Sequence, residues 1–229
     1  MYLSRVRINP TRVKTRQLVG SPQITHALVE GSRPPGGEHH SGRALWRLDR
    51  HGSDLELFVA SPWRPDFTGL VEQTGWPSAP TWDTRDYSPL LRSLVEGQRW
   101  TFRVTVNPTH SVAQGQGRRG KVAPHRTAAH QTCWFVERAL GWGFEVATNS
   151  LPDAPLELEL VERNLVSFRR RAGDGDGDSS RGGRVSLTLA TFVGALRVVD
   201  VERFGQALSM GLGRAKGYGC GLMTLAPPR

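Results

Sequence analysis

The chain of 229 residues has only two cysteines and three lysines, and it lacks a long apolar run. Cys133 and Cys220 lie far apart and neither belongs to a CxxC pair, so a disulfide framework and a zinc site are both unexpected. No apolar segment approaches the roughly 20 residues that cross a bilayer. The first residues alternate between apolar and polar side chains, which predicts a strand rather than a signal peptide. We therefore expect a cytoplasmic protein without membrane contact.

Positive charge is in clear excess, with 30 basic residues against 21 acidic ones and a net charge of +9. Cationic side chains that neutralise phosphates release counterions, so this surplus suits a nucleic-acid partner. Apart from Lys14, Lys121 and Lys216, the basic residues are arginines, which bind phosphates bidentately and stack on bases. A GC-rich genome would also favour arginine codons, so charge alone does not decide the function.

The order of the expected elements predicts two similar halves. Each half begins with an alternating strand, over residues 2–9 and 100–106, that ends at an Asn-Pro dipeptide. A helix over 127–140 follows in the second half, and the later segments complete the order β-α-β-β-α-β. The first half fits the same order. We therefore predict an α+β fold of two tandem ferredoxin-like (RRM-like βαββαβ) domains, over residues 1–94 and 95–229.

Several local expectations can be tested directly. Ser21-Pro22 predicts the start of a helix, because serine caps helices and proline suits the first turn. Ile24 and Leu28 would form the apolar face of this helix. A basic connector is expected over residues 12–16, and a short helix near 66–71 is expected before a strand near 71–74. In the second half, the helix over 127–140 should bury Cys133, Val136 and Leu140 and end at Gly141.

Among the seven histidines, His26 is the best candidate for chemistry. At 100° per residue along a helix, it lies away from Ile24 and Leu28, on the polar side with Gln23 and Glu30. An imidazole titrates near neutral pH and can act there as a general acid or base. The alternative is an ordinary solvated histidine.

A metal-dependent mechanism finds little support in the sequence. Asp174, Asp176 and Asp178 resemble the start of a calcium-binding loop. However, the sixth and twelfth positions hold Ser179 and Val185 instead of glycine and glutamate. Neither an HExxH pattern nor a paired-carboxylate arrangement occurs elsewhere. We expect no metal and no cofactor.

The strongest local signal is a glycine-rich segment over residues 211–222. It matches neither a dinucleotide-binding fingerprint nor a P-loop, and it departs from the RRM aromatic motif after Lys216-Gly-Tyr-Gly. Its backbone N–H groups could hold phosphates closely, although a glycine-rich helix end is the alternative. The candidate RNA contacts in this segment are Gly211, Gly213, Arg214, Lys216 and Gly217.

Other basic residues could contact RNA or could simply be solvated. One cluster lies in a Gly/Gln-rich loop and a second lies at the end of a strand. Together with Lys216, they could line one face of the molecule. The candidates are Arg33, Arg118, Arg119, Lys121, Arg169, Arg170 and Arg171.

This combination of segments resembles the CasE family, the repeat-processing endoribonucleases of type I-E CRISPR systems. The matching segments span nearly the whole chain in the right order. They are the strand ending in Asn9-Pro10, Ser21-Pro22-Gln-Ile-Thr-His26, Leu45-Trp46-Arg47-Leu48, the stretch from Gln98 to Asn107-Pro108, and the glycine-rich loop from Gly211 to Leu222.

The resemblance implies two tandem ferredoxin-like domains that bind the stem-loop of a CRISPR repeat RNA. It implies a cut at the 3′ base of the stem without a metal, because the neighbouring ribose 2′-OH attacks the phosphodiester. The products would be a 2′,3′-cyclic phosphate (or 3′-phosphate) and a 5′-OH. It also implies that the protein stays on its product with the other type I-E Cascade subunits as partners. We expect a monomer when the protein is isolated.

His26 matches the catalytic histidine of the family. Some members carry a tyrosine three residues earlier, where this chain has Gln23, and an amide cannot exchange a proton at neutral pH. His26 would then act alone, with Arg33 or Lys216 supporting the developing charge. The cluster of Arg169, Arg170 and Arg171 resembles a basic hairpin that grips RNA beside the cut.

Two other functions stay open. The first is a non-catalytic RNA-binding subunit of a ribonucleoprotein complex, which the missing tyrosine favours. The second is a ferredoxin-like protein without a nucleic-acid role, which would leave the glycine-rich loop and both arginine clusters unexplained.

Overall fold

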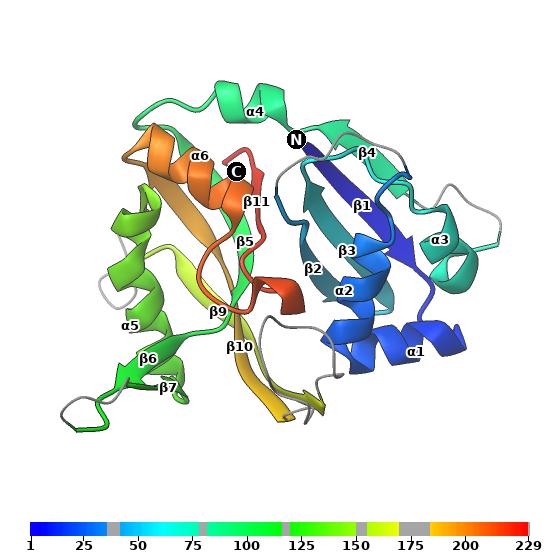
Figure 1. The fold of residues 1–229 in the computed structure, drawn as a ribbon. Coiled ribbons are helices and arrows are strands. Elements are labelled where there is room, and N and C mark those ends of the chain that lie inside the picture. The colour runs from blue at the N-terminus through cyan, green and yellow to red at the C-terminus, as the bar shows by residue number, and fades with distance from the viewer. Residues whose placement is uncertain (36–41, 78–81, 116–119, 150–154, 170–183, 229) are drawn as a thin grey trace.

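A computed structural model of the chain describes residues 1–35, 42–77, 82–115, 120–149, 155–169 and 184–228. Two units of sheet and helix lie side by side, and the chain passes from one to the other near α4 (Figure 1). None of the helices in these ranges has the length and hydropathy that crossing a bilayer requires.

The first unit is an antiparallel sheet of order β2-β3-β1-β4 with its helices. Helices α2 and α3 make the crossovers between strands, and α1 is an additional helix before α2. The elements are β1 (Tyr2–Ile8), α1 (Val13–Gly20), α2 (Pro22–Glu30), β2 (Leu45–His51), β3 (Asp54–Ser61), α3 (Thr68–Thr74), β4 (Trp82–Asp86) and the connecting α4 (Ser88–Arg92).

The second unit repeats this order as β11-β5-β10-β8, with α5 and α6 as the crossover helices. Strand β10 continues beyond β8 and pairs there with β9, with a register shift between Thr191 and Phe192. The elements are β5 (Arg99–Val106), β6 (Thr109–Val112), β7 (Lys121–Pro124), α5 (Ala128–Ala139), η1 (Leu140–Trp142), β8 (Phe144–Val146), β9 (Leu158–Arg169), β10 (Arg184–Val198), α6 (Val201–Met210), η2 (Lys216–Tyr218) and β11 (Met223–Ala226).

Both units therefore have the ferredoxin-like strand order, and the predicted fold class is confirmed. The boundary expected between residues 94 and 95 stays a prediction. Strand β4 pairs in the first sheet, but Tyr87 and Leu94, which follow it, pack in the core of the second unit.

Each unit has its own apolar core, and a third cluster joins the two. The second core is rich in aromatic rings: Phe135 is fully buried and stacks on Phe192 with a centroid distance of 4.6 Å. The joining cluster contains Leu45 and Ala60 of the first unit and Leu222 of the second. The two sheets are thus held in a fixed relation by buried contacts between them.

Two local expectations about the first unit are wrong. The chain from Val13 onward is the helix α1 rather than a connector, and residues 71–74 belong to α3 rather than to a strand. Helix α2 starts at Pro22 as predicted, but it buries Pro22, Thr25 and Val29 more deeply than Ile24 and Leu28. The reason is that α2 packs against both α1 and η2, so the residues that it buries are those that face these two elements.

Helix α5 forms as predicted, but the face that it buries differs from the predicted one. It buries Trp134, Phe135 and Ala139, whereas Cys133 and Leu140 are exposed. The 3-10 turn η1 extends it, and Gly143 with φ 85° ends it in place of Gly141.

Candidate active site

Helix α2 of the first unit places His26 against the glycine-rich loop of the second unit. The turn η2 packs on α2, and a side-chain carbon added at Gly217 would lie 3.7 Å from Nε2 of His26. The imidazole is half-buried, and its Nδ1 is enclosed without a hydrogen-bond partner among the described residues. The polar side of α2 thus faces the other unit rather than open solvent.

Lys216 brings a positive charge to the start of η2, one residue before Gly217. It is half-buried, and this burial lowers the pKa of its ammonium group, with a smaller contribution from the charge of Arg43. A cation held partly out of water attracts a phosphate more strongly than a fully solvated one. Ala215, just before it, has φ 63° and is the single positive-φ residue other than glycine in the described ranges. Such backbone conformations are concentrated at functional sites.

Two glycines of the loop are explained by close packing on strand β2. A side-chain carbon at Gly211 would lie 2.8 Å from Leu45, and one at Gly219 would lie 2.7 Å from the ring of Trp46. Both glycines have positive φ angles. They let the loop of the second unit rest directly on the first, which carries η2 to His26.

Replacing Gly219 by alanine is expected to destabilise the protein by about 1–3 kcal/mol, the usual cost of overpacking. The added carbon meets the buried ring of Trp46. Urea unfolding measures the loss. The matched control is Gly205→Ala in α6, where nothing lies within 4 Å of the added carbon and alanine favours the helix. Equal stability of the two variants would contradict the packing.

The other predicted contacts are spread over the molecule. Arg33 is exposed after α2, and its guanidinium lies 4.0 Å from the centre of the Trp63 ring. Arg214 is exposed between α6 and η2. Lys121 is exposed on the β6–β7 hairpin, which lies well apart from α2 in Figure 1.

Of the remaining predicted contacts, Arg169 belongs to the described residues. The backbone of Arg169 pairs with that of Arg184 at the end of the β9–β10 ladder. The candidates Arg118, Arg119, Arg170 and Arg171 lie outside the described residues, as do the aspartates of the calcium-like segment. Within the described ranges, no group of His, Cys, Asp and Glu side chains could hold a metal ion.

The sequence interpretation gave no role to Arg47, which the structure places at the junction of the two units. Its side chain is almost fully buried, and its guanidinium makes five hydrogen bonds. Two go to Asp49 beside it on β2. The others reach the second unit, at the Arg103 and Leu222 carbonyls and the Thr224 hydroxyl.

Burial alone would raise the pKa of the Asp49 carboxyl. The hydrogen bonds and charge of Arg47, together with those of Arg103, outweigh this effect and lower the pKa. The Nε of Arg103 lies 3.3 Å from Asp49 Oδ1. Asp49 therefore stays ionised and completes a buried charged cluster between the two sheets.

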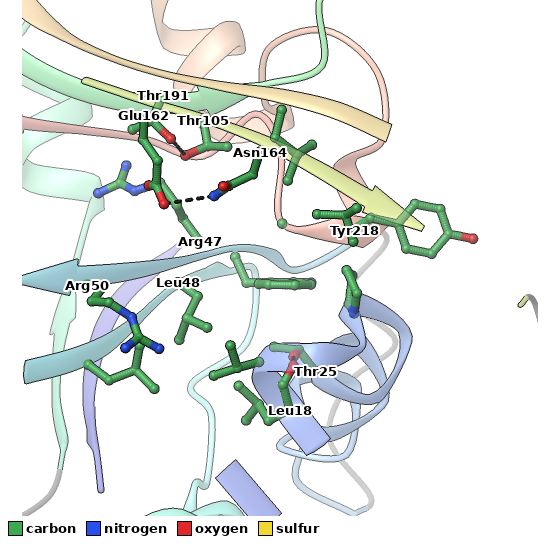
Figure 2. Close-up of a pocket in the computed structure, with 17 residues that line it drawn as sticks. Leu18, Thr25, Arg47, Leu48, Arg50, Thr105, Glu162, Asn164, Thr191 and Tyr218 are labelled. Carbon is green, nitrogen blue, oxygen red and sulfur yellow. Dashed lines mark hydrogen bonds between the residues drawn. The ribbon is translucent and has the colours of Figure 1, made fainter. Parts of the chain in front are cut away.

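A cleft of about 230 Å³ opens beside α2, between strand β2 and strands β9 and β10. Figure 2 shows Glu162 and Asn164 on one wall, Leu48 and Arg50 on the opposite wall, and Tyr218 at one end. Sequence reasoning missed these residues, because they come from distant segments that only the folded chain brings together.

Comparisons with known proteins agree with one another. Residues 1–227 match the family described as CRISPR associated protein. The CRISPR-associated endoribonuclease Cse3 of Thermus thermophilus is 27% identical over 229 residues, which cover 99% of this chain and all of that protein. A structure of CRISPR endoribonuclease Cse3 bound to a 19-nucleotide RNA has a TM-score of 0.80 at 26% identity, covering 99% of this chain and all of that one.

A second similar structure is Thermus thermophilus Cse3 bound to an RNA that represents a pre-cleavage complex. It has a TM-score of 0.77 at 25% identity and covers 99% of this chain and 98% of that one. The likeness therefore extends over both units and over the junction between them.

Proposed function

The chain belongs to the CRISPR associated protein family, and from that premise we propose that it is a metal-independent endoribonuclease that processes CRISPR repeat RNA. It binds the hairpin of the repeat and cuts the precursor at the 3′ base of the stem. The relative from Thermus thermophilus is a CRISPR-associated endoribonuclease, and the similar structures hold RNA. The resemblance to CasE that the sequence indicated is confirmed by this family.

One observation carries the catalytic proposal: the imidazole of His26 has no hydrogen-bond partner among the described residues and faces a cationic, glycine-rich turn. RNA supplies its own nucleophile, so the protein needs to align the strand and move a proton. His26 takes the proton of the 2′-OH as the O2′–P bond forms. The P–O5′ bond breaks, O5′ takes up a proton from solvent and leaves as a 5′-OH, and His26 returns its proton to solvent. The other product is a 2′,3′-cyclic phosphate, which water can open to a 3′-phosphate.

We assign the support of the developing phosphate charge to Lys216 rather than to Arg33. Lys216 lies next to Gly217, which faces His26, whereas the guanidinium of Arg33 lies over the ring of Trp63. Preorganised cations and N–H groups stabilise such charge without reorganising during the reaction. Gly217 is the nearest of the loop glycines to His26 and suits close approach of the RNA backbone.

The remaining basic candidates are proposed as contacts to the RNA backbone outside the reaction centre. They include Arg214 beside the loop and Arg169 at the end of the β9–β10 ladder. The family also supports the proposal that the protein keeps its product and joins the other subunits of a type I-E Cascade complex. Such processing takes place in the cytoplasm, where the free Cys133 and Cys220 would stay reduced.

The test is an incubation of the purified chain with a labelled CRISPR repeat hairpin in excess EDTA. A single cut at the base of the stem is expected, because no step uses a metal. Tight, salt-sensitive binding without a cut would favour the non-catalytic RNA-binding subunit, which Gln23 in place of the family tyrosine suggests. Absence of binding would contradict both functions.

A further inference from the structure

The cleft of Figure 2 offers hydrogen-bonding groups that the fold does not use. Arg47 lines the cleft, but its N–H groups already serve Asp49 and the second unit. The hydroxyls of Thr105 and Thr191 bind each other at 2.8 Å. The guanidinium of Arg47 is therefore not available to a ligand, and the two buried threonine side chains keep at most one free O–H donor between them.

Three other groups lining the cleft remain open. The amide Nδ2 of Asn164 donates to Oε1 of Glu162 at 2.8 Å, which leaves Glu162 Oε2 and Asn164 Oδ1 without hydrogen bonds to described residues. The exposed guanidinium of Arg50 likewise makes no ion pair or hydrogen bond within the described ranges. One wall thus presents acceptors on a carboxylate, and the opposite wall presents a bidentate donor (Figure 2).

The cleft lies directly beside the proposed reaction centre. Pro22 and Thr25, which precede His26 on α2, form part of its lining. Tyr218 and Gly219 form another part, and they follow Gly217, which faces the imidazole of His26. A nucleotide next to the cleaved linkage is therefore the part of the RNA that can place its base here.

The size and lining of the cleft suit one planar ring. A volume of about 230 Å³ is below the roughly 300–1,000 Å³ of sites for drug-sized ligands. Apolar side chains of Trp46, Leu48 and Leu189 offer surface to the faces of a ring. Proteins that recognise RNA by sequence commonly bind single bases that have left the base stack, and they recognise the edges of these bases by hydrogen bonds.

Resting on the proposed function, we propose that this cleft binds a single unpaired guanine of the RNA, at the nucleotide next to the cut. Guanine carries two neighbouring donors, N1–H and the 2-amino group, which match the carboxylate of Glu162. Its O6 and N7 acceptors match a bidentate arginine such as Arg50. Adenine, cytosine and uracil lack this combination of paired donors and paired acceptors.

The test measures binding of repeat hairpins that carry each of the four bases immediately 5′ or immediately 3′ of the cut. The full chain with His26→Ala is used, so that the RNA stays intact. At one of the two positions, guanine should bind about 5- to 150-fold more tightly than the other bases, the range expected for a bidentate base contact. Inosine, which lacks the 2-amino group, should lose part of this advantage.

Glu162→Gln should remove the preference for guanine, because it replaces an acceptor by a donor in the same shape. The matched control is Glu159→Gln, which removes the same charge from an exposed position of β9 outside the cleft and should keep the preference. Equal binding of all four bases at both positions, or a preference that survives Glu162→Gln, overturns the proposal. If the wild type cleaves the RNA but shows no base preference, the guanine-binding proposal is refuted and the proposed nuclease function stands. If guanine is preferred but the wild type does not cleave, only the proposed nuclease function is refuted.

Discussion

Replacing His26 by alanine is expected to slow cleavage of the repeat hairpin by about 10²- to 10⁴-fold, the usual contribution of a positioned general acid or base. The imidazole is the group on α2 that faces the loop beside Lys216, so its removal takes away the proton transfer but leaves the cationic surface. Affinity for the hairpin should therefore stay near that of the wild type. Single-turnover cleavage and filter binding of the same RNA measure the two effects separately.

The matched control is His51→Ala, which removes another histidine of the first unit at the exposed last position of β2. It should cleave at the rate of the wild type. If His26→Ala also cleaves at full speed, His26 has no part in the reaction. If it loses binding as strongly as cleavage, the residue serves structure or RNA contact instead of proton transfer.

Strands and helices with one buried face could be predicted from the sequence. Strands β1 and β5 alternate apolar and polar residues because one face of each sheet is covered, and α2 begins at Pro22 as the Ser21-Pro22 dipeptide predicts. Strand β4 was missed because it is an edge strand that buries no residue deeply. Helix α1 was missed because only Thr15 and Leu18 are buried on it.

The site was only partly accessible to sequence reasoning. Helical spacing placed His26 on the polar side of α2, and the family resemblance then matched it to the catalytic histidine position. The burial of Arg47 and the cleft with Glu162 and Asn164 depend on how β2 meets β5, β9 and β11. No pattern within one segment indicates such a junction, because the partners of Arg47 in the second unit lie 56 to 177 positions away in the chain.

The junction itself gives the second large prediction: Arg47→Met should destabilise the protein by about 3–5 kcal/mol, the cost of breaking one side of a buried ion pair. The variant keeps the apolar stem of the side chain. It leaves Asp49 buried with only Arg103 beside it, and it leaves the Leu222 carbonyl without this donor. A loss of this size is a large part of the 5–15 kcal/mol that typically separates folded from unfolded states. Urea unfolding at neutral pH measures it.

Arg5→Met is the matched control, because Arg5 also lies in the first sheet but its side chain is 41% exposed. Its ion pairs, with Glu56 at 3.7 Å and with Asp83 at 3.8 Å, are long. Its loss should cost at most about 1 kcal/mol, as for other surface pairs. If both variants unfold at the same urea concentration, the buried cluster does not hold the units together.

The pH dependence of stability separates loss of charge from loss of packing in Arg47→Met. In the wild type, the pKa of Asp49 lies below its ordinary 3.8. Its contribution is therefore present above the unfolded pKa and lost as pH falls through the folded one. Without Arg47, the largest effect that opposes burial is lost and the pKa of Asp49 rises, so the variant loses less stability than the wild type when Asp49 is protonated. The difference in stability between wild type and variant should then shrink in acid. A difference that is constant with pH would mean that Arg47 acts by packing alone.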